Sequence, residues 1–278
     1  MLLIVPDSYK QIKNNIDLCD GFILSLDGFS VNTKYKINLN DLKKIMKITK
    51  DKEIYLSINK NIENNLVEKL EKILLELNKY PIKGVIYSDV CVLTFKDKLN
   101  YELIFGAEHF ITNYETINYF DLLGVDGVYL SSDITKDEIS DIISKIRVKT
   151  FVNLFGYLSM FVSKRNIVKN YLEYFNIKDE SKIYYMEKEG KIYPIIDEDE
   201  TSVFTNYIYN GIIEYFNIKP DYYILNGFLI DDDKFNEVLK LVNNITKENI
   251  LDINKKINDM FDNVDTGFLY KETVSKVK

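Results

Sequence analysis

The stretch that decides the fold is IYLSINKNIENNLVEKLEKILLELNKYPIKGVIYSD, residues 54–89. It opens with a short apolar run, IYLSI at 54–58, and closes with a second, GVIYSD at 84–89. Between them, apolar residues recur on one helical face: Ile62, Leu66, Leu70, Ile73, Leu74 and Leu77. Tyr80-Pro81 ends that helix, because proline has no amide proton to continue it. A strand, a helix and a second strand in this order predict a βαβ unit with parallel strands.

The same alternation continues on both sides of this unit. Further strands are predicted at 2–5, 22–26, 101–108, 127–132, 149–156 and 222–230, and further helices at 8–18, 40–49, 114–123 and 135–146. Thr135 and Glu138 have the spacing of a capping box at the start of the last of these helices. About eight strand–helix units predict an α/β fold of the (β/α)8 TIM-barrel type. A doubly wound open sheet is the alternative, although no GxGxxG sequence follows the first strand.

One stretch, residues 176–210, interrupts the alternation. It reads as two strands around Lys188-Glu189-Gly190, a β-hairpin inserted before the last barrel strand. Its position places it on the face where the loops of barrels carry function. The closing segment, 232–278, is expected to contain two helices. Because neither a linker nor an internal repeat is visible, we expect a single domain over 1–278.

Composition limits the possible functions. The chain has 36 Lys and Arg against 43 Asp and Glu, and its net charge of −7 argues against a general nucleic-acid binder. Cys19 and Cys91 are the two cysteines, so one chain cannot supply the four cysteines of an iron–sulfur cluster, and we expect no cofactor. No apolar run approaches the length of a membrane span. The N-terminal MLLIVPDSYK reads as a buried strand rather than a signal peptide, and we expect no membrane partner and a cytoplasmic protein.

Polar residues that follow strands are the first candidates for a site, because the carboxyl ends of barrel strands meet at one face. This rule selects Asp27, Asn59, Asp89, Glu108, Asp133 and Asn226. The alternative is that these side chains cap helices and turns. Glu108 is the least typical of a cap, and a carboxylate beside His109 could perform acid–base chemistry. Adjacent strand residues face opposite ways, however, so we expect His109, the only histidine, to be structural.

A second candidate region is residues 149–175, where basic and aromatic side chains alternate. Such a pattern suits single-stranded nucleic acid, because cations contact phosphates and rings stack on bases. The alternative is a buried strand followed by an amphipathic helix. Arginine occurs only at Arg147 and Arg165, so Arg165, next to Ser163 and Lys164, is a candidate for a specific contact.

In this region the sequence resembles a known family. FVSKRNIVKNYLEYF at 161–175, IYPIIDED at 192–199 and GFLYKETVSKVK at 267–278 are similar to the short form of the peptidase U32 family, collagenase-like protease homologues of bacteria. The resemblance extends to CDGFIL at 19–24, to YLSIN ending at Asn59, to VIYSDVCVL around Asp89, and to Glu108 followed by Thr112-Asn113-Tyr114. It covers nearly the whole chain in the expected order.

The resemblance implies a (β/α)8-like barrel and two activities. One is proteolysis of collagen-like substrates. The other is hydroxylation, including hydroxylation of the tRNA wobble uridine. Many of the members with this activity hold an iron–sulfur cluster on four cysteines. The sequence also departs from the family: Phe155-Gly156 replaces His-Gly, Ser159 replaces a cysteine, and Ser132-Asp133 replaces Arg-Glu. An arginine-containing stretch has become Phe29 to Asn32. Serine and asparagine cannot replace the bidentate clamp of an arginine.

These observations lead to one expectation and two alternatives. We expect a role in tRNA modification of the wobble-uridine hydroxylation type, as an enzyme or as an accessory subunit. The expected partners are tRNA, bound through 149–175, and a longer U32 homologue. The alternatives are a hydrolase of the collagenase-like protease type and a non-catalytic barrel that pairs with an active homologue. The predicted catalytic residues are Glu108, Asp133 and Asp89, and the predicted substrate-binding residues are Asn59, Asn113, Ser163, Lys164 and Arg165.

Overall fold

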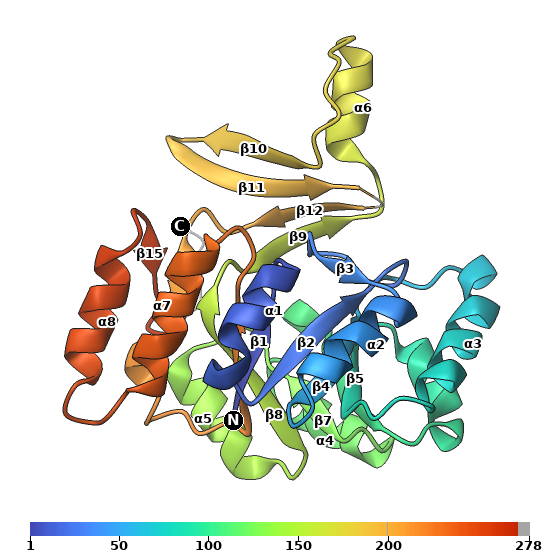
Figure 1. Cartoon of the computed structure of the whole chain (residues 1–278), viewed down its shortest axis with the longest axis horizontal. Helices are drawn as coiled ribbons and strands as arrows, with labels where there is room; N and C mark the ends of the chain where they lie inside the picture. The colour runs from blue at the N-terminus through green and yellow to red at the C-terminus, as the bar shows by residue number, and fades with distance from the viewer. Residues whose placement is uncertain (199, 272–278) are drawn as a thin grey trace, which may run out of the picture.

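Eight parallel strands close into a barrel in the computed structural model (Figure 1). The structure describes residues 1–198 and 200–271, without the side chain of Glu108. The eight strands are β1 (Leu2–Val5), β2 (Gly21–Leu26), β4 (Glu53–Ile58), β5 (Gly84–Tyr87), β6 (Glu102–Phe105), β7 (Gly127–Tyr129), β8 (Lys149–Gly156) and β14 (Tyr222–Asn226). The barrel closes because β14 pairs in parallel with both β1 and β8. The predicted (β/α)8 fold is therefore confirmed, and the open sheet is excluded.

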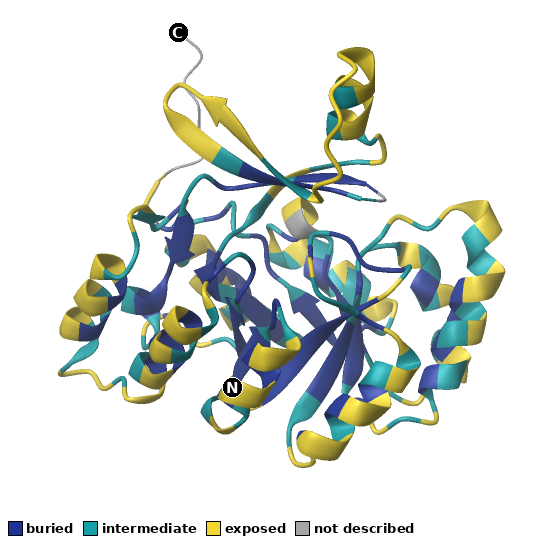
Figure 2. Ribbon diagram, turned by 45° about the horizontal axis from the view of Figure 1, so that its top comes forward, coloured by how far each residue is buried: buried dark blue, intermediate teal, exposed yellow. Residues whose placement is uncertain are grey.

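Side chains fill the inside of the barrel. Tyr55, Phe151 and Tyr222 are buried there together, and the rings of Phe151 and Tyr222 stack with centroids 4.4 Å apart. A larger apolar layer lies between the barrel and the helices, since alternate residues of each strand face outward. Figure 2 shows the barrel strands as the most buried part of the molecule. Because described side chains pack the barrel interior, we expect ligand space beyond the strand ends.

Helices surround the barrel much as the sequence predicts. They are α1 (Tyr9–Asn15), α2 (Leu39–Ile48), α3 (Val67–Leu77), α4 (Tyr114–Leu122), α5 (Lys136–Lys145), α7 (Asp232–Asn243) and α8 (Ile250–Asp259). The helix expected from Ile62 begins only at Val67, after a 3-10 turn, η2 (Asn64–Leu66). One reason is that the Ile62 amide donates to Asp89, which lies after the next strand. A further 3-10 segment, η3 (Val90–Lys98), stands where a barrel helix would follow β5.

A four-stranded antiparallel sheet lies across the carboxyl end of the barrel (Figure 1). It consists of β9 (Ser159–Ser163), β10 (Ile183–Lys188), β11 (Lys191–Asp197) and β12 (Thr201–Phe204), in the order β10-β11-β12-β9, and we call it the roof sheet. The predicted hairpin is its β10–β11 pair, with Glu189 and Gly190 both at positive φ in the turn. The helix α6 (Ile167–Tyr174) projects beside it and has no buried residue. The 149–175 region thus contains an additional strand, β9, that the sequence pattern did not reveal.

Shorter elements complete the chain. The strands β3 (Lys36–Ile37), β13 (Ile208–Asn210) and β15 (Val264–Asp265) extend the barrel sheet, and η1 (Ile16–Leu18), η4 (Glu108–Phe110) and η5 (Ile212–Glu214) are 3-10 turns. The last part of the GFLYKETVSKVK motif, from residue 272, lies outside the described residues. Among the described helices, none has both the length and the apolar character needed to cross a membrane.

Candidate functional site

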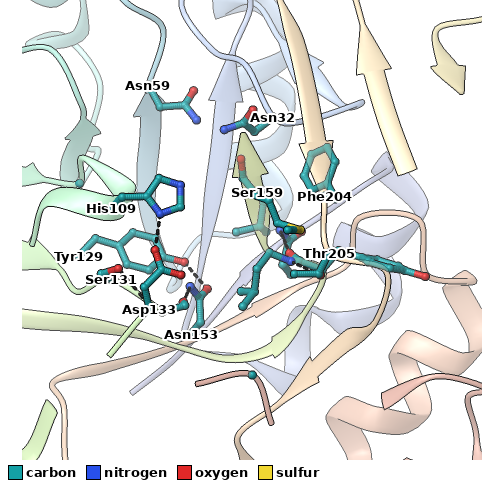
Figure 3. A pocket seen from close by; sticks show the side chains of 18 of the residues that line it. Asn32, Asn59, His109, Tyr129, Ser131, Asp133, Asn153, Ser159, Phe204 and Thr205 are labelled. Carbon is teal, nitrogen blue, oxygen red and sulfur yellow. Dashed lines mark hydrogen bonds and ion pairs between the residues drawn. The ribbon is translucent and has the colours of Figure 1, made fainter. Parts of the chain in front are cut away.

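A cavity of about 690 Å³ lies between the barrel mouth and the roof sheet (Figure 3). Each barrel strand contributes a wall residue in or just after its carboxyl-terminal half: Val5, Ser25, Ser57, Ile86, Gly106, Tyr129, Asn153 and Asn226. The roof sheet supplies Ser159, Met160, Tyr193 and Phe204. The last described residues add Phe268 and Lys271 at the rim. The cavity therefore occupies the position at which barrel proteins bind their ligands.

Asn59 shapes one side of this cavity. Its Oδ1 accepts the Val31 amide at 2.9 Å, and its Nδ2 donates to the Val31 carbonyl at 3.2 Å. A further hydrogen bond, from the Ser30 hydroxyl to the Ser57 carbonyl at 2.5 Å, holds the loop that follows β2 against β4. These bonds bring Asn32, which has a positive φ of 61°, into the wall. Asn59 is thus both a wall residue and the support of a second amide in the wall.

His109 and Asp133 form a pair in the part of the wall that follows β6 and β7. The Asp133 carboxylate and the His109 Nδ1 are joined by a hydrogen bond, and both side chains are about half exposed. His109 lies in η4, just after β6, and Asp133 lies after β7, so neighbouring strands place the two groups together. The sequence pattern predicts a structural role for His109, yet the structure places its ring in the cavity wall.

A directed chain of hydrogen bonds runs along the same wall. The Tyr129 hydroxyl donates to Asn153 Oδ1 at 2.5 Å, and Asn153 Nδ2 donates to the Ser132 Oγ at 2.7 Å. All three residues line the cavity. Since Asn153 uses its carbonyl as acceptor and its amide as donor in this chain, its orientation is fixed.

The β8–β9 connection brings the roof sheet over the mouth. Gly156 adopts a φ of 122°, and a Cβ there would lie 2.3 Å from the Asn226 carbonyl oxygen, so only glycine fits. Beyond this turn, the Ser159 Oγ is buried without a hydrogen-bond partner among the described residues. Thr205 ties the two sides of the roof together, since its backbone amide donates to the Leu158 carbonyl at 2.9 Å.

The cavity is nearly neutral. Among the described residues, its ionisable side chains apart from tyrosines are His109, Asp133 and Lys271, and Lys271 is paired with Asp265 at 3.2 Å. Burial raises the pKa of the wall tyrosines Tyr157 and Tyr207, so both remain protonated at neutral pH. Amides and hydroxyls form the rest of the polar wall, which suits an uncharged ligand with several donors and acceptors.

The His, Cys, Asp and Glu side chains of the described residues are spread apart rather than clustered. Within residues 1–198 and 200–271, no three His, Cys, Asp or Glu side chains gather closely enough to hold a metal ion. Cys19 is buried in the main core, and burial raises the pKa of its thiol to about 12. Burial, reinforced by Asp89, likewise raises the pKa of Cys91 to about 12. Two separated, protonated thiols do not match a cluster that needs four thiolates.

Of the predicted site residues that the structure describes, only some lie in the cavity, and the side chain of Glu108 is outside the described part of the chain. Asn59 and Asp133 line the cavity, as does Asn226, which the strand-end rule also selected. Asp89 does not line it: its carboxylate accepts the amides of Cys91 and Ile62 at 3.0 and 2.9 Å and caps η3. Burial acts to raise the pKa of Asp89, but these amide bonds outweigh it and the pKa is lowered. Asn113 caps α4 by accepting the Thr116 amide at 2.9 Å.

Three further predicted residues lie on the outer part of the roof. Ser163 ends β9 and accepts the Arg165 amide at 3.1 Å, while Lys164 forms an exposed ion pair with Glu63 at 3.2 Å. None of Ser163, Lys164 and Arg165 belongs to the described cavity wall. The residues that the sequence argument missed are His109, Asn153, Tyr129 and Ser132. Of these four, His109 and Ser132 lie at the ends of the predicted strands 101–108 and 127–132, which is a signal that the sequence offers. Tyr129 and Asn153 lie inside predicted strands, where the strand-end rule selects nothing.

A parallel eight-stranded barrel with a covered cavity at its carboxyl end defines a TIM-barrel protein with its candidate site at the mouth. Within that class, the sequence model of peptidase family U32 matches residues 18–181, more than half of the chain, and the chain belongs to this family.

Two relatives extend this result. "tRNA hydroxylation protein P2" of Bacillus subtilis (strain 168) is 25% identical over 303 aligned positions that cover 98% of each chain. The solved structure of the U32 peptidase Mk0906 superposes with a TM-score of 0.53 at 12% identity, covering 81% of this chain and 91% of the other. The likeness to Mk0906 shows that the two proteins share a fold.

Proposed function

We propose that this protein acts in tRNA modification of the wobble-uridine hydroxylation type, and that the cavity at the barrel mouth receives the base. The observation that carries this proposal is the likeness to tRNA hydroxylation protein P2, which extends over nearly the full length of both chains. The neutral cavity wall of amides and hydroxyls agrees with a base as ligand, because bases present uncharged donors and acceptors. The working compartment under this proposal is the cytoplasm.

The proposal includes a route for the RNA around the cavity. Large aromatic side chains are exposed on β9 of the roof sheet and in and just after α6, namely Phe161, Tyr171, Tyr174 and Phe175. Arg165 lies between β9 and α6, within the same region. Rings stack on unpaired bases and an arginine contacts phosphate, so this surface suits a single-stranded loop. The net charge of −7 opposes RNA binding by this chain alone, and we therefore include a longer U32 homologue as partner.

The decisive experiment measures tRNA nucleosides by mass spectrometry in cells with and without the gene. We expect hydroxylated wobble uridine to be lost on deletion and restored by the wild-type gene. Asn153→Ala should fail to restore it, because this substitution breaks the hydrogen-bonded wall between Tyr129 and Ser132. The matched control is Asn244→Ala, an exposed asparagine at the end of α7 that does not line the cavity. An unchanged nucleoside profile on deletion would overturn the proposal.

One observation favours a second function, that of a peptidase. Ser159, His109 and Asp133 line the same cavity, and a Ser-His-Asp set can cleave peptides by nucleophilic attack. Against it, the Ser159 Oγ has no hydrogen-bond partner among the described residues, so His109 does not activate it in this arrangement. Gelatin cleavage by the purified protein that disappears in Ser159→Ala would establish this activity.

A further inference from the structure

The His109–Asp133 pair is the acid–base group of the cavity that the family likeness does not explain. His109 is the only imidazole of the chain. Since an ionised carboxylate can only accept, Asp133 fixes the proton of the neutral ring on Nδ1 and leaves Nε2 with its lone pair. Figure 3 shows the second ring nitrogen directed away from Asp133, into the cavity. The geometry therefore presents a proton acceptor to a bound ligand.

Backbone bonds hold the two loops that carry this pair. The Asp133 amide donates to Ser131 Oγ at 3.1 Å, and the Ser131 amide donates to the Ile111 carbonyl at 3.0 Å. The second bond ties the end of β7 to the segment that follows His109. Side-chain exposures of 47% for His109 and 43% for Asp133 leave the pair accessible from the cavity. The hydrogen bonds of the Asp133 and Ser131 amides, rather than burial, thus position the His109–Asp133 pair.

A donor accompanies this acceptor. The bond chain from Tyr129 through Asn153 ends on the Ser132 oxygen, which leaves the Ser132 hydroxyl proton available to a ligand. Ser132 is next to Asp133 in the chain, and both line the cavity. An acceptor and a donor in one wall complement an N–H group beside a carbonyl, as on the imide edge of a uracil base. Amide and hydroxyl groups recognise such uncharged edges in RNA-binding sites.

We propose that His109 Nε2 accepts the N3 proton of a uracil base bound in the cavity, with Ser132 donating to the adjacent carbonyl oxygen. The base N–H bond breaks and its electron pair stays on the ring as a delocalised anion. The proton forms a new N–H bond on His109, and Asp133 stabilises the resulting imidazolium. No electron is transferred in this step. His109 is the catalytic residue and Asp133 a positioning residue, and the substrate class rests on the function proposed above.

The test uses nuclear magnetic resonance of the full chain labelled with ¹⁵N-histidine, in which one histidine gives one pair of ring signals. The probes are an anticodon stem-loop RNA with uridine at the wobble position and the same RNA with 3-methyluridine there. We expect Nδ1 protonated and Nε2 bare in the free protein. The uridine RNA should protonate Nε2, and the methylated RNA, which lacks the N3 proton, should not. An Nε2 signal that responds to neither RNA, or equally to both, overturns the proposal.

Two variants separate a positioning role from a merely structural one. Asp133→Asn keeps the shape of the side chain but removes the carboxylate, and we expect it to move the histidine proton to Nε2 in the free protein. Asp137→Asn, on the exposed first turn of α5, is the control and should leave the ring signals unchanged. Circular dichroism confirms that each variant is folded. Wild-type ring signals in Asp133→Asn would show that the carboxylate does not set the tautomer.

The outcomes distinguish this inference from the proposed function. If deletion of the gene abolishes the tRNA modification but His109→Gln restores it, the function stands and the proton transfer is wrong. If His109 responds only to the uridine RNA while deletion leaves tRNA unchanged, the cavity binds the base and the proposed function is wrong.

Discussion

At the scale of single residues, Asp7 is a buried carboxyl that weakens the fold. It follows β1 and is 8% exposed, and its Oδ1 has no hydrogen-bond partner among the described residues. Burial raises its pKa from the ordinary value of 3.8, although Lys34, 3.6 Å away, acts in the opposite direction. A raised carboxyl pKa means that ionisation opposes folding, so the cost is present at neutral pH and disappears as the pH falls below the ordinary value.

We therefore predict that Asp7→Asn raises the free energy of unfolding at pH ~7 by about 1 kcal/mol. The new amide removes the charge, and its oxygen can still accept the Leu229 amide. Urea unfolding at pH ~7 and pH ~5 measures the effect, which should shrink at the lower pH. A loss of stability at neutral pH would show that the Lys34 pair contributes more than burial costs.

The strand-end rule, applied residue by residue to the sequence, predicted only part of the candidate site. The strand-end rule found Asn59 and Asp133 because it depends on barrel geometry alone. It excluded His109 by assuming that the strand continued to 108, so that adjacent residues would face opposite ways. In the structure β6 ends at Phe105, and residues 108–110 form a 3-10 turn that lets His109 reach the cavity. Asp89 was selected because a capping carboxylate and a site carboxylate occupy the same strand-end position.

At the scale of elements, α5 begins with the capping box that the sequence predicts. The Glu138 amide donates to Thr135 Oγ1 at 3.3 Å, and the Thr135 amide donates to Glu138 Oε2 at 2.7 Å. We predict that Thr135→Ala lowers the free energy of unfolding by about 1 kcal/mol, because one amide of the first turn loses its acceptor. Urea unfolding measures the change. Ser144→Ala, at an exposed hydroxyl in the last turn of the same helix, is the control and should stay close to the wild type.

Glu198 links the roof sheet to the barrel. It follows β11 and pairs with Lys36 of β3 at 2.7 Å and with Lys182 at 2.6 Å. Burial acts to raise the pKa of Glu198, but hydrogen bonds from Lys182 and Lys36 outweigh it and the pKa is lowered from 4.5. The stabilisation from these pairs is therefore full above pH 4.5 and is lost as the pH falls through the lowered value.

We predict that Glu198→Gln makes the amides of β12 exchange with deuterium faster at neutral pH, by an amount that corresponds to about 0.5 kcal/mol. Glu187→Gln, exposed on β10 of the same sheet, is the matched control. The difference between Glu198→Gln and the wild type should vanish in acid, where the wild-type carboxylate is neutral. Equal exchange in both variants at neutral pH would show that the apolar contacts of the roof sheet suffice to hold it.

The hairpin of the roof sheet was predictable, but its neighbours were not. Glu189-Gly190 marks a tight turn between adjacent strands, which is a local signal. The pairing of β9 with β12 joins residues about forty positions apart, and no turn residue announces it. Apolar residues on α6 gave a helical pattern without revealing that no residue of this helix is fully buried.

At the scale of the whole molecule, charge limits how RNA can bind. The chain carries a net charge of −7, and Lys164 and Lys182 of the roof region are already paired with carboxylates. If Arg165 and Lys169 make the main phosphate contacts, the slope of log affinity against log salt should be about −2. Affinity for an anticodon stem-loop RNA should then fall only about tenfold between ~50 and ~200 mM salt.

Filter binding across this salt range tests the prediction, and the two arginines provide matched variants. Arg165→Gln should make the slope shallower by about one, since it removes one phosphate contact. Arg147→Gln should leave it unchanged, because Arg147 precedes β8 at the opposite end of the barrel. A slope of about −6 or steeper would point to a broad basic surface instead.

The pairing that closes the barrel determines when the barrel can be completed during synthesis on the ribosome. Leu2–Val5 pairs with Tyr223–Asn226, and the terminal amine of Met1 donates to the Asp221 carbonyl at 2.8 Å. To form this pair, β1 must therefore wait until β14 has been synthesised, which takes roughly ten seconds or more at common translation rates. During this delay one edge of the nascent sheet stays open, although the segments of the roof sheet have already emerged. Chaperone demand during synthesis should accordingly be greatest just before residue 226 leaves the exit tunnel.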